Sequence, residues 1–143
     1  LSLHDALSSA LDAWVRCCGK VLLLADPMLE WPSERPFGDP LLPPTIFADT
    51  GLLAHWGLRL DAPDRRGTRN GKLAGYDIVT MSPGTLTGKC EIGSGGLVAH
   101  CRIGAGSATI VADADLLDTQ RLGPGASHNL DAVLEELAAF ERK

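Results

Sequence analysis

Two short apolar runs that both end in Ala-Asp constrain this chain more than any other feature of its sequence. They lie within residues 20–27 (KVLLLADP) and 108–116 (ATIVADADL). A run of aliphatic and β-branched residues that a polar residue ends is typical of a strand buried on both faces. A helical pattern over 3–15 precedes the first run, and another over 130–140 follows the second. The sequence therefore predicts an α/β domain in which strands 21–25 and 109–112 lie side by side and parallel.

The segments between these runs are shorter and more varied. Six of the nine prolines lie in residues 27–49, which predicts a long irregular crossing segment. A short helix over 50–56, capped by Asp49 or Thr50, and a strand over 58–60 follow. Residues 61–75 are polar and Gly-rich and are interpreted as a loop, whereas 76–81 is a strand. Residues 89–92 and 97–103 flank Gly93-Ser94-Gly95-Gly96 and predict an antiparallel hairpin.

Two amphipathic helices are expected to close the core. The first has apolar residues at helical spacing from Leu3 to Val15, with Ser2 as its N-cap. The second has the stripe Leu130, Val133, Leu134, Leu137 and Ala138. Because the chain opens on a helix start and has no initiating Met, we expect it to be a segment of a longer protein.

Charge and length restrict the partners. The 143 residues fit a single domain, 1–143. Thirteen basic and eighteen acidic residues give a net charge of −5, which argues against a nucleic-acid partner. The one basic cluster, Arg65, Arg66, Arg69 and Lys72, is either a solvated loop or a contact for phosphate or anionic lipid. No apolar run reaches the roughly 18 residues of a membrane span, so only segments absent from this chain would contact a membrane.

The four cysteines do not form a metal-binding pattern. No CxxC pair occurs, so a structural zinc site is not predicted. If Gly95-Gly96 is the hairpin turn, Cys90 falls opposite Cys101, where the two side chains are close enough for a bridge. The pair is therefore either a disulfide, which would imply an oxidising compartment, or two buried thiols.

Acidic residues follow both predicted central strands. Ligands of parallel sheets bind beyond the carboxyl ends of the strands, where Asp26, Asp113 and Asp115 are expected. These carboxylates could hold a hard cation such as Mg²⁺; alternatively, Asp115 could cap the next helix and Asp26 could cap or brace the loop at Pro27. His128 and Asn129 precede the last helix and could face the same end, although an N-cap role for Asn129 is the alternative.

The motifs of common enzyme classes are missing from the sequence. It contains no nucleophile elbow of the GxSxG type, no GxGxxG that opens a helix after a strand, and no P-loop. The sequence therefore predicts no catalytic residue, no resident metal and no cofactor.

Several short segments together resemble a known family. They are residues 11–27 (LDAWVRCCGKVLLLADP), 52–60 (LLAHWGLRL), 104–117 and 129–137 (NLDAVLEEL). In their order and spacing the chain resembles the class I glutamine-amidotransferase-like domain of uncharacterised gliding-motility-type ABC transporter auxiliary proteins. Residues 62–103 contribute little to the likeness.

The resemblance implies a fold and a setting. The fold would be a flavodoxin-like or class I amidotransferase-like layered sandwich, with a mostly parallel central sheet and one antiparallel hairpin. The domain would be extracytoplasmic (periplasmic), tethered to a membrane in the full-length protein, and associated with the permease or ATPase subunits of a transporter. It would lack the Cys-His-Glu triad, and Asp26, Asp113 and Asn129 match the family's strand ends and helix start.

Two functions are therefore expected. The first is a non-catalytic binding or scaffolding domain of a membrane ABC-type transport system, in which Asp26, Asp113, Asp115, His128 and Asn129 form a weak ligand site. The alternative is a metal-dependent hydrolase that uses the aspartates at the strand ends.

Overall fold

The two apolar runs form neighbouring parallel strands. In the computed structural model, which describes residues 3–42, 46–47 and 50–142, β1 (Lys20–Leu24) pairs in parallel with β8 (Gly106–Val111). The register runs from Lys20 opposite Ser107 to Leu24 opposite Val111. One further hydrogen bond, 2.8 Å from the Ala25 N–H to the Val111 carbonyl, extends the pairing. The parallel pairing that the twin runs predicted is confirmed.

The rest of this sheet overturns the expected fold class. The strand order is β1-β8-β7-β6, and β7 (Val98–Ile103) pairs antiparallel with both β8 and β6 (Glu91–Gly93). The predicted mostly parallel, flavodoxin-like or class I amidotransferase-like sandwich is therefore wrong, and the molecule is a small β-rich domain with a mixed sheet. A parallel crossover needs a dozen or more residues, whereas Gly104-Ala105 and the 3₁₀ turn η1 (Ser94–Gly96) join these strands directly.

Two antiparallel strand pairs stand apart from the main sheet. They are β2 (Leu58–Asp61) with β5 (Thr85–Gly88), and β3 (Thr68–Leu73) with β4 (Tyr76–Met81). The interpretation of residues 61–75 as a loop is wrong for β3, because hairpin pairing with β4 overrides its polar, Gly-containing composition. Ala74 and Gly75 turn this hairpin with positive φ at both positions, as a tight two-residue turn requires.

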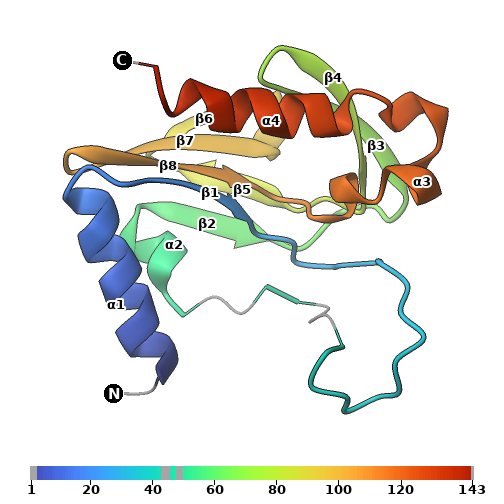
Figure 1. Ribbon diagram of the computed structural model, residues 1–143, viewed down its shortest axis with the longest axis horizontal. Helices are drawn as coiled ribbons and strands as arrows, with labels where there is room; N and C mark the ends of the chain where they lie inside the picture. Colours follow the sequence, from blue (N-terminus) through green and yellow to red (C-terminus); the bar gives the residue numbers. More distant parts are fainter. Residues whose placement is uncertain (1–2, 43–45, 48–49, 143) are drawn as a thin grey trace.

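Helices cover both faces of the main sheet. Figure 1 shows α4 (Asn129–Ala139) across one face, and α2 (Leu52–His55) with β2 on the other; α1 (Leu3–Arg16) lies at the edge near the start of β1. The short helix α3 (Thr119–Leu122) and the turns η2 (Asp115–Leu117) and η3 (Pro124–Ala126) connect β8 to α4. The predicted caps Ser2 and Asp49 lie outside the described residues.

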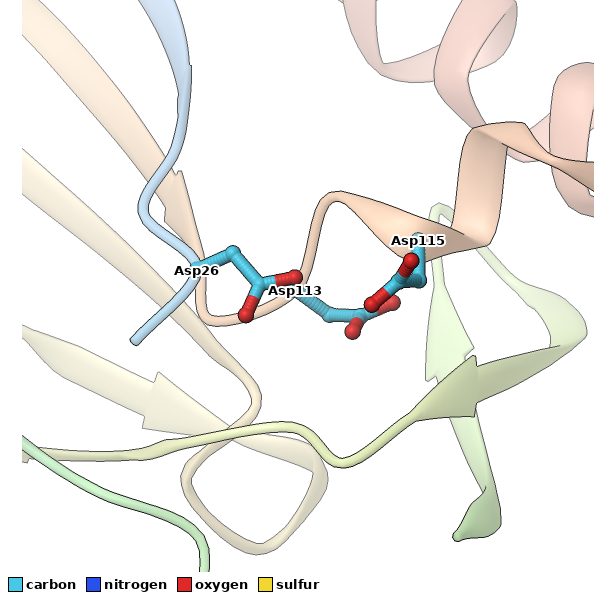
Figure 2. A group of neighbouring side chains, drawn as sticks. All are labelled: Asp26, Asp113 and Asp115. Atoms are coloured by element: carbon cyan, nitrogen blue, oxygen red, sulfur yellow. The ribbon is translucent and has the colours of Figure 1, made fainter. Parts of the chain in front are cut away.

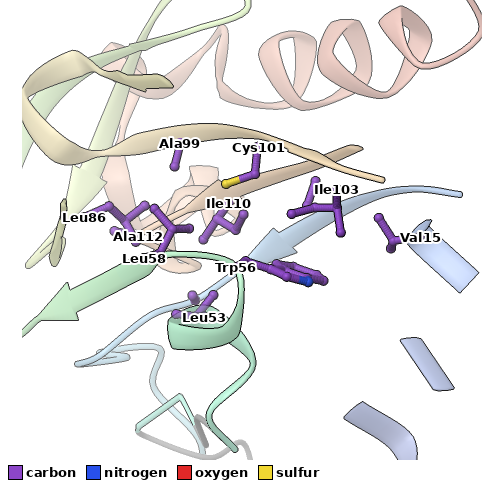
Figure 3. Packing of buried hydrophobic residues seen from close by; sticks show 12 residues of the cluster. Val15, Leu53, Trp56, Leu58, Leu86, Ala99, Cys101, Ile103, Ile110 and Ala112 are labelled. Carbon is purple, nitrogen blue, oxygen red and sulfur yellow. The ribbon is translucent and has the colours of Figure 1, made fainter. Parts of the chain in front are cut away.

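The main sheet separates two hydrophobic cores. The larger core joins the sheet to α1, α2, β2 and β5 (Figure 3), and its buried residues include Val15, Leu53, Trp56, Leu58, Leu86, Cys101, Ile103 and Ile110. The smaller core lies on the opposite face with β3, β4 and α4, and comprises Leu73, Ile78, Leu97, Val98, Val111, Leu116 and Ala132. The sheet therefore packs on both faces, with Val98 and Val111 in the smaller core and Cys101, Ile103 and Ile110 in the larger one.

Only part of the predicted apolar stripe of α4 faces the core, because Val133 packs against the smaller core whereas the leucines do not. Leu130, Leu134 and Leu137 are 46%, 63% and 42% exposed, and the helix buries Asn129, Ala132 and Glu136 instead. The helix is rotated in this way because Asn129 and Glu136 are hydrogen-bonded to the strands beneath it. The spacing of the apolar residues identified the stripe, but it did not show whether each of them faces the core or the solvent.

Candidate carboxylate site

Three aspartates converge where β1 and β8 end. Ala25 and Asp26 are the two residues after β1, and Asp113 and Asp115 follow β8. Because the two strands are parallel neighbours, their carboxyl ends meet, and one carboxylate oxygen from each residue lies within 4.8 Å of the others. All three side chains are buried (Figure 2). The structure thus brings together the three aspartates that the sequence placed at this end.

Backbone N–H groups hold two of these carboxylates in place. Asp26 accepts hydrogen bonds from the N–H of Met28 at 2.8 Å and of Ala114 at 2.9 Å, one on each oxygen. Asp113 Oδ2 accepts from the Leu116 N–H at 2.9 Å at the start of η2. The bracing role that the sequence left open for Asp26 is therefore present, whereas the capping role left open for Asp115 is not, because Asp113 makes the contact at the start of η2. These contacts leave Asp113 Oδ1 buried and without a hydrogen-bond partner.

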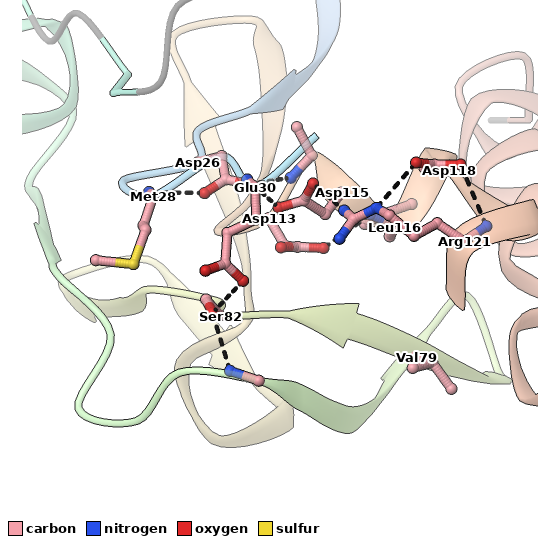
Figure 4. A network of polar contacts seen from close by, with 12 residues as sticks. Asp26, Met28, Glu30, Val79, Ser82, Asp113, Asp115, Leu116, Asp118 and Arg121 are labelled. Carbon is pink, nitrogen blue, oxygen red and sulfur yellow. Dashed lines mark hydrogen bonds and ion pairs between the residues drawn. The ribbon is translucent and has the colours of Figure 1, made fainter. Parts of the chain in front are cut away.

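The third carboxylate is tied to a charged network that sequence reasoning missed. Asp115 accepts from the Glu30 N–H at 2.9 Å and from the Arg121 guanidinium at 2.7 Å. The Glu30 carboxylate in turn accepts from the Ser82 hydroxyl (Figure 4) and pairs with Arg66. No local pattern identifies Glu30, because it lies in the Pro-rich segment and reaches the cluster only through the tertiary fold.

The electrostatics of the cluster reflect burial and crowding. Burial, reinforced by the charges of Asp26 and Asp115, raises the pKa of Asp113 to about 8, and the hydrogen bond from the Leu116 N–H opposes this increase. Burial also raises the pKa of Asp115. In contrast, hydrogen bonds from Arg66 and Ser82 lower the pKa of the Glu30 carboxyl. Of these carboxylates, Asp113 is therefore the one whose negative charge is least stabilised by neighbouring donors and cations.

Asn129 and His128 do not extend this cluster. The Asn129 amide accepts from the Val79 N–H at 3.0 Å and donates to the carbonyls of Val79 and Leu116, so all its contacts fasten α4 to β4 and η2. His128 occupies the N-cap position without a side-chain cap and is exposed beside the Tyr76 ring and Asp131. Both residues therefore belong to the α4 junction.

The hairpin cysteines are joined. Cys90 and Cys101 form a disulfide with their Cα atoms 4.8 Å apart, and the β6–β7 register places Glu91 opposite His100 directly beside it. Cys17 and Cys18 are free and exposed. The bridge belongs to the larger core, where Cys101 is buried and Cys90 packs against it.

A separate groove of about 580 Å³ lies between α4 and the β6–β8 face of the sheet. Its polar centre is the buried Glu136, whose Oε1 accepts from the Thr109 hydroxyl and contacts His100 Nε2, both at 2.8 Å. A hydroxyl nucleophile would instead donate to a histidine base. The groove therefore contains an acid with two partners and no hydroxyl–histidine pair.

Comparisons with known proteins show a likeness of fold. No family model and no curated protein matches the chain. Among solved structures it is similar to the exo-β-1,4-mannosidase Op5Man5 from Opitutaceae bacterium strain TAV5, with a TM-score of 0.57 and 15% identity. The match covers 94% of this chain but 23% of the mannosidase chain, so the chain spans about a quarter of the protein that it resembles. No described helix is long and apolar enough to cross a membrane.

Proposed function

We propose that this chain is a non-catalytic binding or scaffolding domain, and that the outer face of α4 packs against a folded protein partner. The observation that carries the proposal is the row of Leu130, Leu134 and Leu137, which repeats at the spacing of one helix face and lies in solvent. A row of exposed leucines on one helix is typical of a protein-interaction face.

The arrangement of polar groups supports a non-catalytic role. Asp26, Asp113 and Asp115 are buried, and each accepts a backbone N–H. The groove of about 580 Å³ beside α4 is lined by other residues, among them Glu136. Metal-dependent hydrolysis would require the carboxylates to face a substrate, so this alternative has less support than scaffolding.

The setting that we propose is the membrane transport system indicated by the sequence resemblance, with a permease or ATPase complex as the partner. The Cys90–Cys101 disulfide supports an extracytoplasmic location, because disulfides persist in oxidising compartments. A second setting is a domain of a multidomain glycan-processing enzyme. It is favoured by the likeness to about a quarter of a mannosidase chain.

A photo-crosslinking residue at position 134 in the full-length protein tests the interaction face in its own cells. We expect crosslinks to a permease or ATPase subunit, identified by mass spectrometry. Crosslinks to a catalytic domain of the same polypeptide would instead select the second setting. Position 41, an equally exposed leucine outside α4, is the matched control. Crosslinks to a second copy of the chain, or the same pattern from both positions, would overturn the proposal.

Activity provides the complementary test of the non-catalytic role. The purified chain should hydrolyse neither glutamine nor mannosides, with or without added Mn²⁺. Hydrolysis that Asp113→Asn abolishes would establish the hydrolase alternative.

A further inference from the structure

The carboxylate cluster has the features of a cation site that the scaffolding role does not explain. Three aspartate side chains direct oxygens to within 4.8 Å of one another in a buried space (Figure 2). A second observation is independent of this proximity. Asp113 is fully buried, yet its Oδ1 lacks any hydrogen-bond partner. Since buried polar atoms almost always have a partner, this oxygen indicates a missing ligand.

The charge balance points to a divalent ion. Asp26, Asp113 and Asp115 would carry three negative charges when ionised, and Arg121 is the cation bonded to one of them. The other nearby guanidinium, Arg66, is paired with Glu30. Because Arg121 is shared with Asp118, the three aspartates have less than one full positive charge beside them, and a bound divalent cation would reduce their net negative charge. Ionised carboxylates buried without such compensation are strongly unfavourable.

The number and chemistry of the oxygens narrow the choice of ion. Carboxylate oxygens are ligands for hard cations. Mg²⁺ usually keeps several waters and is bound by one or two carboxylates, whereas Ca²⁺ accepts several carboxylates in a flexible geometry. Three buried aspartates that each contribute an oxygen therefore favour Ca²⁺ over Mg²⁺.

We propose that Asp26, Asp113 and Asp115 together bind one Ca²⁺ ion through one carboxylate oxygen each. The backbone N–H contacts of Asp26 and Asp113 are compatible with this role, because a carboxylate oxygen has two lone pairs. The ion would tie the segment after β1 to the segment after β8. It is thus a structural site that goes beyond the scaffolding function.

Metal titration of the chelator-treated chain tests the site. At pH 8.5, where Asp113 is ionised, calorimetry should show one saturable Ca²⁺ per chain, and Ca²⁺ should raise the melting temperature more than Mg²⁺ does. Terbium luminescence, displaced by Ca²⁺, gives a second measurement of the same site. The absence of saturable binding at millimolar Ca²⁺ would overturn the proposal.

Variants then assign the ligands. Asp113→Asn keeps the shape of the side chain and should weaken Ca²⁺ binding at least tenfold, whereas Asp77→Asn, an exposed carboxylate on β4, should leave it unchanged. Asp26→Asn provides a second test if Asp113→Asn does not fold. Equal affinity in wild type and both cluster variants would show that Ca²⁺ binds elsewhere. This result would leave the α4 crosslinks unaffected, so the two proposals fail independently.

Discussion

At the level of single residues, Asp113 is the described carboxyl whose pKa is raised the most. Its carboxyl is buried, has two aspartate neighbours and retains one oxygen without a hydrogen bond. Its position at the end of a predicted strand was sufficient to identify it as a candidate ligand residue. The pairing of β1 with β8 decided that Asp26 and Asp115 would crowd it.

The metal-free protein should lose stability as pH rises. Asp113 has its pKa raised from 3.8 to about 8, so between these values the folded chain binds a proton that the unfolded chain does not. The free energy of unfolding should therefore fall across this window by at most about 1.4 kcal/mol per pH unit. Urea unfolding in chelator at several pH values measures the slope.

Asp113→Asn should flatten this slope, because an amide does not titrate. Asp77→Asn is the control, since Asp77 is exposed and its pKa is lowered by Lys72. A slope in Asp113→Asn as steep as in the wild type would assign the pH dependence to another group.

Where the end of α1 meets the start of β8, the backbones approach so closely that position 106 has no space for a side chain. A Cβ at Gly106 would lie 2.0 Å from the Val15 carbonyl oxygen and 2.1 Å from that of Gly19. The Ser107 N–H donates to the same Gly19 carbonyl. The backbone at Gly19 therefore cannot move away from Gly106 without breaking this hydrogen bond. This contact fixes where α1 ends relative to the central strands.

Gly106→Ala should therefore destabilise the domain by about 3 kcal/mol, the upper part of the range for overpacking. Gly93→Ala is the matched control, because a Cβ there meets nothing within 4 Å and its φ of −128° suits any residue. Its free energy of unfolding should stay within about 0.5 kcal/mol of the wild type. Similar losses in both variants would mean that glycine flexibility, and not the close approach, is the cause.

For the whole molecule, the disulfide is the covalent link across the main sheet. Cys101 belongs to the larger core, and Cys90 packs against it at the start of β6. The bridge closes a loop with a sequence separation of 11 residues. Closing such a loop reduces the entropy of the unfolded chain.

Removing the bridge with Cys90→Ala and Cys101→Ala should lower the free energy of unfolding by about 2–4 kcal/mol. Reductant should destabilise the wild type and have no effect on the double variant, as urea unfolding with and without dithiothreitol would measure. Cys17→Ala, at an exposed free thiol, should behave like the wild type. Insensitivity of the wild type to reductant would contradict a stabilising role for the bridge.

The sequence by itself determined the local features of this protein. The apolar runs predicted two neighbouring parallel strands, the glycines of 93–96 predicted a hairpin whose register places Cys90 opposite Cys101, and the strand ends identified Asp26, Asp113 and Asp115. These features depend on residues close together in the chain, so composition and spacing are enough to predict them.

Only the tertiary structure decided how these parts are arranged. It made the sheet mixed, formed β3 from a polar segment, turned the leucines of α4 to solvent, and brought Glu30 and Arg121 to the carboxylate cluster. Strand direction depends on the length of the connections, and the face that a helix buries depends on which polar groups its neighbours can satisfy. Both are set by residues far apart in the chain, which is why the predicted parallel sandwich was wrong while the parallel pairing of β1 with β8 was confirmed, with β1 at the edge of the sheet.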